Sequence, residues 1–143
     1  MTFRGRESLV LGGTLTLLAA VAHLACIAIG PKAYRFMGAG ERMVRASEAG
    51  SFKPTLITTV ISGMLVVWAL YAFSGAGMIG PLPFARLALW TISIAYLVRA
   101  FGFPVLRRAF PDNSLTFWLS SSSICLVLGT LYAIGALTLD ELS

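Results

Sequence analysis

A histidine inside a long apolar stretch is the first residue whose chemistry stands out in this sequence. His23 is the one histidine of the chain and lies within SLVLGGTLTLLAAVAHLACIAIG. Imidazole in a membrane-spanning helix is costly unless it faces the interior of the helix bundle, pairs with a polar group or meets water. His23 can therefore act as a proton acceptor or a polar anchor for a ligand, or its nitrogens can simply bond Thr59, Ser62 or a serine at 120–123. With no second histidine, we predict no metal site.

A second candidate pair lies on a later apolar stretch. Tyr96 and Arg99 are three residues apart, which places them on one face of a helix. A cation beside a phenol can hold an anionic group or stabilise a thiolate. Alternatively, the arginine reaches up to lipid phosphates and the tyrosine belongs to the interfacial aromatic belt. The serine run 120–123 adds hydroxyls, of which we select Ser122, but no carboxylate accompanies it that would make a serine nucleophile.

The charged connector 31–54 carries five of the eleven basic residues of the chain. Glu41 and Arg45 stand four residues apart, a spacing that supports a short helix over 41–49. Arg42 and Arg45 are candidate contacts for an anionic group. The simpler interpretation is a positively charged loop that lies on anionic lipid.

The amino-acid composition predicts the helices that carry these residues. The chain of 143 residues is 57% hydrophobic and 12% charged, whereas soluble domains are about 45–50% apolar. Its apolar runs match the roughly 20 residues that a membrane helix needs. We predict an all-α integral membrane four-helix bundle with short loops, a single membrane domain over 1–143, with helices at about 8–30, 55–75, 82–102 and 115–137. The first run is longer than a signal-peptide core of about 7–15 residues, so it is kept as a helix.

The distribution of lysine and arginine predicts the orientation. Eight of these residues flank the connectors 31–54 and 103–114, against three on the other side. The positive-inside rule then places both connectors in the cytosol and both termini outside, in a bacterial inner or plasma membrane. The net charge of +5 is explained in this way, and no nucleic-acid partner is expected.

Depth along these helices groups the candidates. At about 1.5 Å per residue, the polar side chains fall into one slab roughly 6–15 Å below the cytosolic surface. We call this set the polar layer: His23, Ser62, Tyr96, Arg99 and Ser122. The connector residues Arg42 and Arg45 would form a cytosolic rim above it.

Part of this pattern resembles the MAPEG membrane proteins of eicosanoid and glutathione metabolism. The resemblance rests on the run ERMVRA at 41–46, with Tyr96 and Arg99 at the cytosolic end of the third helix. It implies trimers of four-helix subunits that hold glutathione near the cytosolic face, with arginines such as Arg42 binding the cofactor and Arg99 or Tyr96 stabilising its thiolate. The chain departs from the family pattern at Ala49 and Phe52, where that pattern has asparagine and glutamate.

Three functions are compatible with these residues. The favoured one is a non-catalytic membrane protein without a cofactor, whose polar layer binds a lipid or small amphipathic ligand or packs a partner subunit. A homo-oligomer is expected because so small a bundle exposes most of its perimeter, and the small residues Gly12, Thr16 and Ala20 allow close helix contact. The second function is a glutathione-dependent transferase, as the resemblance implies, and the third is a transporter or channel subunit that uses His23.

Overall fold

The computed structural model describes residues 3–111 and 113–142, which form seven helices and no strand. The prediction of an all-α fold is confirmed. The elements in chain order are α1 (Phe3–Ile29), α2 (Pro31–Phe36), α3 (Glu41–Glu48), α4 (Lys53–Gly75), α5 (Ala85–Phe101), α6 (Phe103–Ala109) and α7 (Leu115–Leu142). The short helix predicted over 41–49 is α3. The connectors thus contain three helices, of which the sequence predicted one.

Three helices, α1, α4 and α7, are long and apolar enough to cross a membrane. A fourth crossing exists if α5 and α6 count as one broken span, bent by 69°. The bend follows from Pro104, which has no N–H to continue the ladder of α5. The third helix is therefore shorter than the predicted 82–102: it begins at Ala85, after Phe84 in a left-handed conformation with φ 56°, and ends at Phe101.

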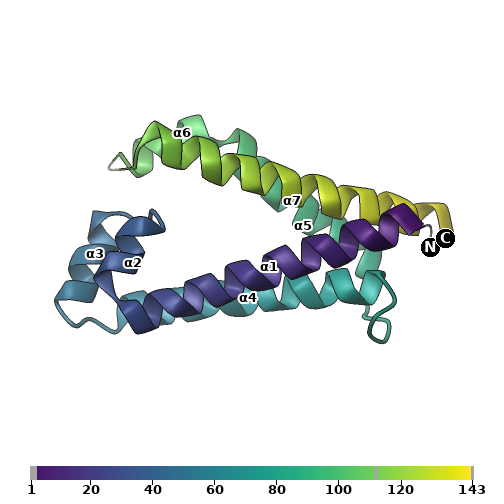
Figure 1. Ribbon diagram of the computed structural model, residues 1–143, viewed down its shortest axis with the longest axis horizontal. Helices are drawn as coiled ribbons and strands as arrows, with labels where there is room; N and C mark the ends of the chain where they lie inside the picture. Colours follow the sequence, from purple (N-terminus) through teal and green to yellow (C-terminus); the bar gives the residue numbers. More distant parts are fainter. Residues whose placement is uncertain (1–2, 112, 143) are drawn as a thin grey trace.

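The long helices form two pairs that spread apart like a V. Helix α1 runs beside α4, and α5 runs beside α7; the start of α1 and the end of α7 lie at the closed end of the V (Figure 1). At the other end, the open end, α2, α3 and α6 lie with the connectors (Figure 1). Helices α1, α4, α5 and α7 therefore pack together at the closed end, whereas the pairs separate towards the connectors.

Glycines explain why the pairs meet at the closed end. A Cβ on Gly135 of α7 would overlap Leu9 of α1, and one on Gly12 would lie 3.3 Å from the ring of Tyr132. Leu9, Leu89 and Tyr132 are fully buried there. The absence of a side chain at these glycines lets backbones approach closely, as membrane helices do at small residues.

A buried polar cluster joins the pairs next to this core. Tyr96 of α5 shares a hydrogen bond of 2.9 Å with Thr16 of α1. The hydroxyl of Tyr132 lies 3.2 Å from the same Thr16 oxygen and donates to the Trp68 carbonyl at 3.0 Å. The rings of Trp68 and Tyr96 meet edge to face, with centroids 5.1 Å apart. Tyr96 is thus a buried residue between helices and not part of an interfacial aromatic belt.

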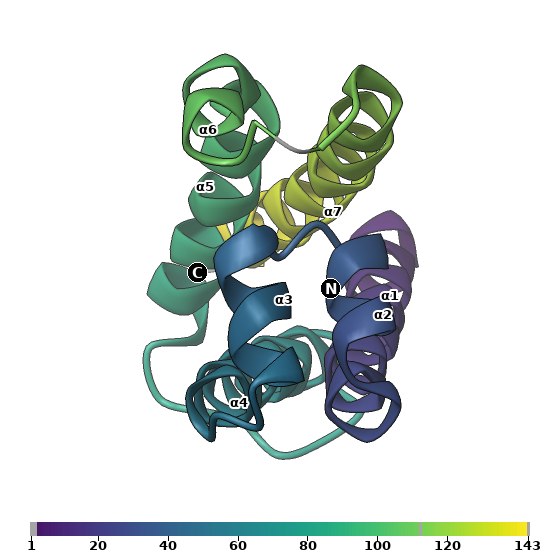
Figure 2. The same cartoon turned by 90° about the vertical axis from the view of Figure 1, so that its left-hand side faces the viewer.

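The open end is spanned by the connector. Tyr34 of α2 and Val44 of α3 pack with Cys26 in a small core beside the α1–α4 pair. From there the segment 36–40 reaches the other pair, where the Asn113 side chain donates to the Gly38 carbonyl at 3.1 Å. Gly38 has φ +74°, and any Cβ there would overlap the Phe117 ring. Seen end-on, α3 lies across the opening between the two pairs (Figure 2).

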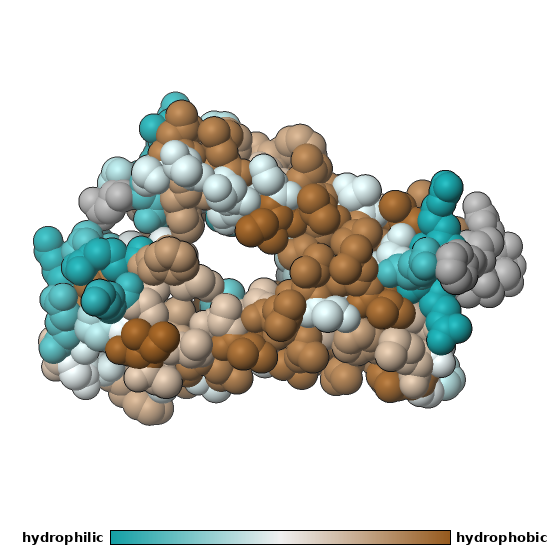
Figure 3. Space-filling view, in the orientation of Figure 1, coloured by the Kyte–Doolittle hydropathy of each residue, from teal (hydrophilic) through white to brown (hydrophobic). Residues whose placement is uncertain are grey.

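The surface is divided along the long axis. Hydrophilic residues gather at the two ends, with a broad hydrophobic belt between them (Figure 3). Large apolar side chains in this belt are exposed, among them Leu18, Val60 and Val127. Soluble proteins rarely expose apolar patches of this extent. The belt and the long apolar helices are consistent with an integral membrane protein in contact with the lipid bilayer.

Candidate functional site

The space between the two helix pairs contains a cavity of about 460 Å³, which we call the inter-arm cavity. It falls within the range of small-molecule sites, about 300–1,000 Å³. Figure 3 shows the molecule hollowed between the pairs. The lining comes from α1, α2, α4, α5 and α7 and from Met37: Ala19, His23, Phe36, Met37, Leu65, Tyr96, Phe117, Ser120, Ser121, Ile124, Cys125 and Leu128. It is apolar apart from an imidazole and a few hydroxyls.

His23 lines this cavity and is held by its own helix. Its Nδ1 lies 2.7 Å from the Ala19 carbonyl, one turn earlier. A carbonyl oxygen only accepts, so Nδ1 is the donor of this bond, and among the described residues no second bond fixes the role of Nε2. The expected partners are engaged elsewhere, because Thr59 donates to the Thr55 carbonyl and Ser62 to the Ala20 carbonyl. Of the partners considered for His23, Thr59 and Ser62 are thus bonded elsewhere, whereas Ser120 and Ser121 line the same cavity as the imidazole.

Arg99 lies between α5 and α7, beside Ser121 of the cavity lining, and does not itself line the cavity. Its Nη2 donates to the Ser121 hydroxyl at 2.8 Å, and Ser121 itself lines the cavity. Its guanidinium carbon sits 5.0 Å from the ring centroid of Trp118, within the range of a cation–π contact. The arginine is therefore fixed against α7. It does not share a binding point with the Tyr96 hydroxyl, which is bonded to Thr16.

Three buried polar atoms around Arg99 have no hydrogen-bond partner among the described residues. They are Arg99 Nη1, Trp118 Nε1 and Ser122 Oγ. Trp118 and Ser122 are 2% and 7% exposed and stand one turn apart on α7. A buried donor without an acceptor costs about 1–3 kcal/mol, and more when it is charged. Arg99 Nη1 and Trp118 Nε1 can only donate, whereas the Ser122 hydroxyl can donate or accept, so this cluster has more donors than acceptors.

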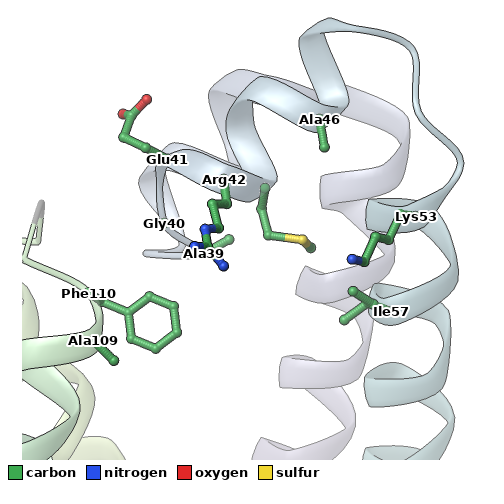
Figure 4. A pocket seen from close by; sticks show the side chains of 10 residues that line it. Ala39, Gly40, Glu41, Arg42, Ala46, Lys53, Ile57, Ala109 and Phe110 are labelled. Carbon is green, nitrogen blue, oxygen red and sulfur yellow. The ribbon is translucent and has the colours of Figure 1, made fainter.

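A second cavity of about 670 Å³ lies under the connector, and we call it the connector cavity. Arg42 of α3 and Lys53 of α4 point into it, Phe110 closes the far side, and Glu41 points away (Figure 4). Glu41 instead lies 3.6 Å from Arg35, which also lies 3.8 Å from Glu48. Among the described residues, this cavity is therefore lined by the cations Arg42 and Lys53, and the carboxylate of Glu41, which also belongs to the lining, is turned away from it.

The segment 36–40 separates the two cavities. Phe36 and Met37 line the inter-arm cavity, whereas Ala39 and Gly40 line the connector cavity. Because this segment is bonded to Asn113 and packed on Phe117, it forms a wall between them.

The predicted site residues are distributed over five places. His23 and Tyr96 line the inter-arm cavity, and Arg42 lines the connector cavity. Ser62 is bonded to the α1 backbone and lines neither cavity. Arg99 and Ser122 lie at the α5–α7 contact, and Arg45 is exposed on α3. The structure therefore does not bring the polar layer and its rim into one cluster.

Sequence reasoning missed Trp118 and Ser121, which hold Arg99. A signal was present, since Trp118, Ser121, Ser122 and Cys125 are spaced by three and four residues and share one side of a helix. Cys125 lines the inter-arm cavity and Cys26 packs in the connector core; both thiols are free. Among the described residues, no group of three His, Cys, Asp or Glu side chains could hold a metal ion.

No protein-family model, curated protein or solved structure matches this chain. The resemblance to MAPEG proteins therefore rests on residues 41–46, Tyr96 and Arg99 alone.

Proposed function

We propose that this protein is a small, non-catalytic, polytopic membrane protein whose single membrane domain binds a lipid or another amphipathic molecule in the inter-arm cavity. The observation that carries the proposal is the cavity itself: a space of about 460 Å³ between helix pairs, apolar over most of its lining, with an imidazole and serine hydroxyls on its walls. An acyl chain suits such a lining because it has no polar group that would lose hydrogen bonds to water when it enters the cavity.

The orientation in the membrane belongs to the same proposal. Both connectors face the cytosol of a bacterial inner or plasma membrane, and both termini lie outside, because lysine and arginine favour the cytosolic side. The open end of the V then faces the cytosolic leaflet. The cations Arg42 and Lys53 sit at headgroup level there, where anionic lipid is attracted to basic residues.

Glutathione chemistry has weaker support. The three arginines that would bind it are separated: Arg42 lines the connector cavity, Arg45 is exposed, and Arg99 is fixed against Ser121. Titration of the purified protein with glutathione discriminates the two functions. A saturable thermal shift at millimolar glutathione would favour a transferase over lipid binding.

Transport and subunit assembly are two further candidate functions, each with its own readout. A transporter would use His23, and flux into proteoliposomes that falls in a folded His23→Ala variant would favour that function. If the protein has an assembly role, cross-linking in native membranes should trap a homo-oligomer or a complex with a partner subunit. A yield of this cross-linked product that added lipid does not change would favour subunit packing over ligand binding.

A photoactivatable lipid tests the proposed function directly. Every membrane protein touches lipid, so the criterion is saturable labelling within the cavity. A probe with a diazirine in its acyl chain should label Ile124 and Leu128, and excess unlabelled lipid should compete this labelling away more readily than labelling at exposed Val60. Labelling that spreads evenly over the apolar belt, without saturation, would contradict the proposal.

A matched pair of variants sharpens this test. Ala19→Phe adds a ring to the cavity lining, whereas Ala28→Phe adds the same ring on the exposed side of α1. We expect the first variant to reduce saturable labelling at least fivefold and the second to leave it within twofold of the native chain. Equal effects of the two variants would contradict the assignment of the site to the inter-arm cavity.

A further inference from the structure

We infer that the molecule bound in the inter-arm cavity carries an anionic oxygen group, a carboxylate or a phosphate, which is received by Arg99, Trp118 and Ser122. This inference rests on the proposed function for the apolar part of the ligand and adds the chemical class of its head. Three buried polar atoms have no hydrogen-bond partner among the described residues: Arg99 Nη1, Trp118 Nε1 and Ser122 Oγ.

The three groups belong to one site. The Arg99 guanidinium stacks on the Trp118 ring at 5.0 Å, and Ser122 follows Trp118 by one helical turn on α7. Arg99 Nη2 is already occupied by Ser121, so the guanidinium is oriented while Nη1 remains unbonded. Buried polar groups in folded proteins are nearly always hydrogen-bonded, and a cluster of exceptions requires an explanation.

The kind of acceptor follows from charge. The cluster combines one permanent cation with an indole N–H donor and a hydroxyl that can donate or accept, and among the described residues no carboxylate forms a salt bridge with Arg99. A neutral acceptor would leave the guanidinium charge unbalanced in apolar surroundings, where an unpaired charge is most costly. A carboxylate or phosphate oxygen balances it and accepts charge-assisted hydrogen bonds, which are the stronger kind.

The location of the cluster links it to the cavity. Ser121 both accepts from Arg99 and lines the inter-arm cavity, and Tyr96, one turn before Arg99 on α5, lines it too. The chain that fills the apolar part of the cavity therefore lies against Ser121 and Tyr96, the lining residues next to this cluster. A single-chain amphiphile with an anionic head fits this arrangement.

Competition between matched amphiphiles tests the inference. Dodecanoate, dodecyl phosphate and neutral dodecanol would each displace the photoactivatable lipid from the purified protein in uncharged detergent. We expect at least one of the two anionic compounds to be tenfold or more potent than dodecanol on the native chain. Arg99→Gln should remove that preference, Trp118→Phe should reduce it several-fold, and Arg107→Gln, which changes an exposed arginine of α6, should preserve it. Equal potency of all three on the native chain would overturn the inference and leave the proposed function intact.

A measurement on the native chain guards against variants that do not fold. With ¹⁵N-labelled tryptophan, the indole N–H resonance of Trp118 should shift on addition of dodecanoate or dodecyl phosphate, and stay in place with dodecanol. Acetate and inorganic phosphate distinguish a site for a free anion from a site for a lipid headgroup. If these small anions shift the Trp118 resonance as far as the amphiphiles do, and the amphiphiles do not displace the lipid probe, the result would support the anion site and contradict the proposed function. A resonance that no anion moves would overturn the inference.

One acidic residue in the connector needs its own control, because Asp112 lies outside the described residues. Asp112→Asn should leave the preference for the anionic compounds within twofold of the native value. A tenfold or larger rise in their potency would show that this carboxylate already satisfies the donors in the free protein, and would overturn the inference.

Discussion

Thr16 of α1 and Tyr96 of α5 share a buried hydrogen bond of 2.9 Å, and this bond joins the two helix pairs beside the inter-arm cavity. The same Thr16 oxygen lies 3.2 Å from the Tyr132 hydroxyl, so one threonine serves an aromatic residue from each helix of the α5–α7 pair. The position at which the V begins to open is thus set by a threonine that the sequence marks only as a small residue.

Removal of this link should destabilise the contact between the pairs. Tyr96→Phe deletes the hydroxyl while Thr16 keeps Tyr132, so we expect the free energy of unfolding to fall by about 1 kcal/mol. Thr16→Val leaves two buried phenols with one partner fewer and should cost about 2 kcal/mol. Reversible unfolding in mixed micelles provides the measurement.

The control for this prediction is Tyr71→Phe. Tyr71 donates to the Pro83 carbonyl at 3.0 Å at an exposed position, where water can replace the lost bond. Its effect on the free energy of unfolding should be smaller than that of Tyr96→Phe. If both variants lowered the free energy of unfolding equally, the buried hydrogen bond of Tyr96 would contribute no more to stability than the exposed one of Tyr71.

Close packing at the closed end gives a second prediction. A Cβ on Gly135 would overlap Leu9, so Gly135→Ala should lower the free energy of unfolding by about 1–3 kcal/mol through overpacking. Gly63 of α4 is exposed, with no atom within 4 Å of such a Cβ. Gly63→Ala should therefore be neutral or raise stability by up to about 1 kcal/mol through helix propensity.

The two glycine variants also address association between copies. Gly63 faces away from the chain itself, so an effect of Gly63→Ala on the mass of the purified particle would place a subunit contact there. A Gly135→Ala variant as stable as the native chain would contradict the packing described at the closed end.

The long helices were predictable because their signal is local. Apolar runs of membrane-spanning length fix α1, α4 and α7, and the i,i+4 pair of Glu41 and Arg45 indicates α3. The ends of α5 were less predictable. Its start depends on Phe84 in a left-handed conformation, which no propensity favours, and on the Leu82 N–H that donates to the Ser74 hydroxyl eight residues earlier.

The arrangement of the pairs was not predictable from one sequence. Gly63 and Gly135 are equivalent as small residues in apolar helices, yet one meets open space and the other meets Leu9. The same holds for the site, since Ser120–Ser123 cover every direction around α7. Ser121 rather than Ser122 receives Arg99 because of how α5 packs on α7, a tertiary property that helical periodicity does not encode.

The bridge between the pairs at the open end yields a third prediction. The Asn113 side chain donates to the Gly38 carbonyl at 3.1 Å, and the Phe117 ring packs on Gly38. Asn113→Ala removes this bond, and we expect the pairs to open further or to sample a broader range of separations. Spin labels at exposed Ser51 and Arg108, in a chain without its two cysteines, would report this as a longer or wider distance distribution.

The matched control is an amide that keeps the donor. Asn113→Gln retains the N–H₂ group on a longer side chain, so its distribution should lie between those of the native chain and Asn113→Ala. If the Asn113→Ala distribution were identical to the native one, the segment 36–40 would be held by the connector core of Cys26, Tyr34 and Val44 alone.

The bent pair α5–α6 makes the number of crossings a testable quantity. If α5 with α6 crosses the membrane, the chain has four spans and its termini share one side; if it does not, three spans place the termini on opposite sides. The proposed orientation predicts that alkaline phosphatase is active when fused after residue 143 or inserted in the exposed turn at Gly80, and inactive at Gly50. Green fluorescent protein should give the reverse pattern, since it folds in the cytosol. Phosphatase activity at Gly80 but not at the C-terminus would show that α5 enters the membrane without crossing it, and the inter-arm cavity would then lie between three spanning helices and one re-entrant helix.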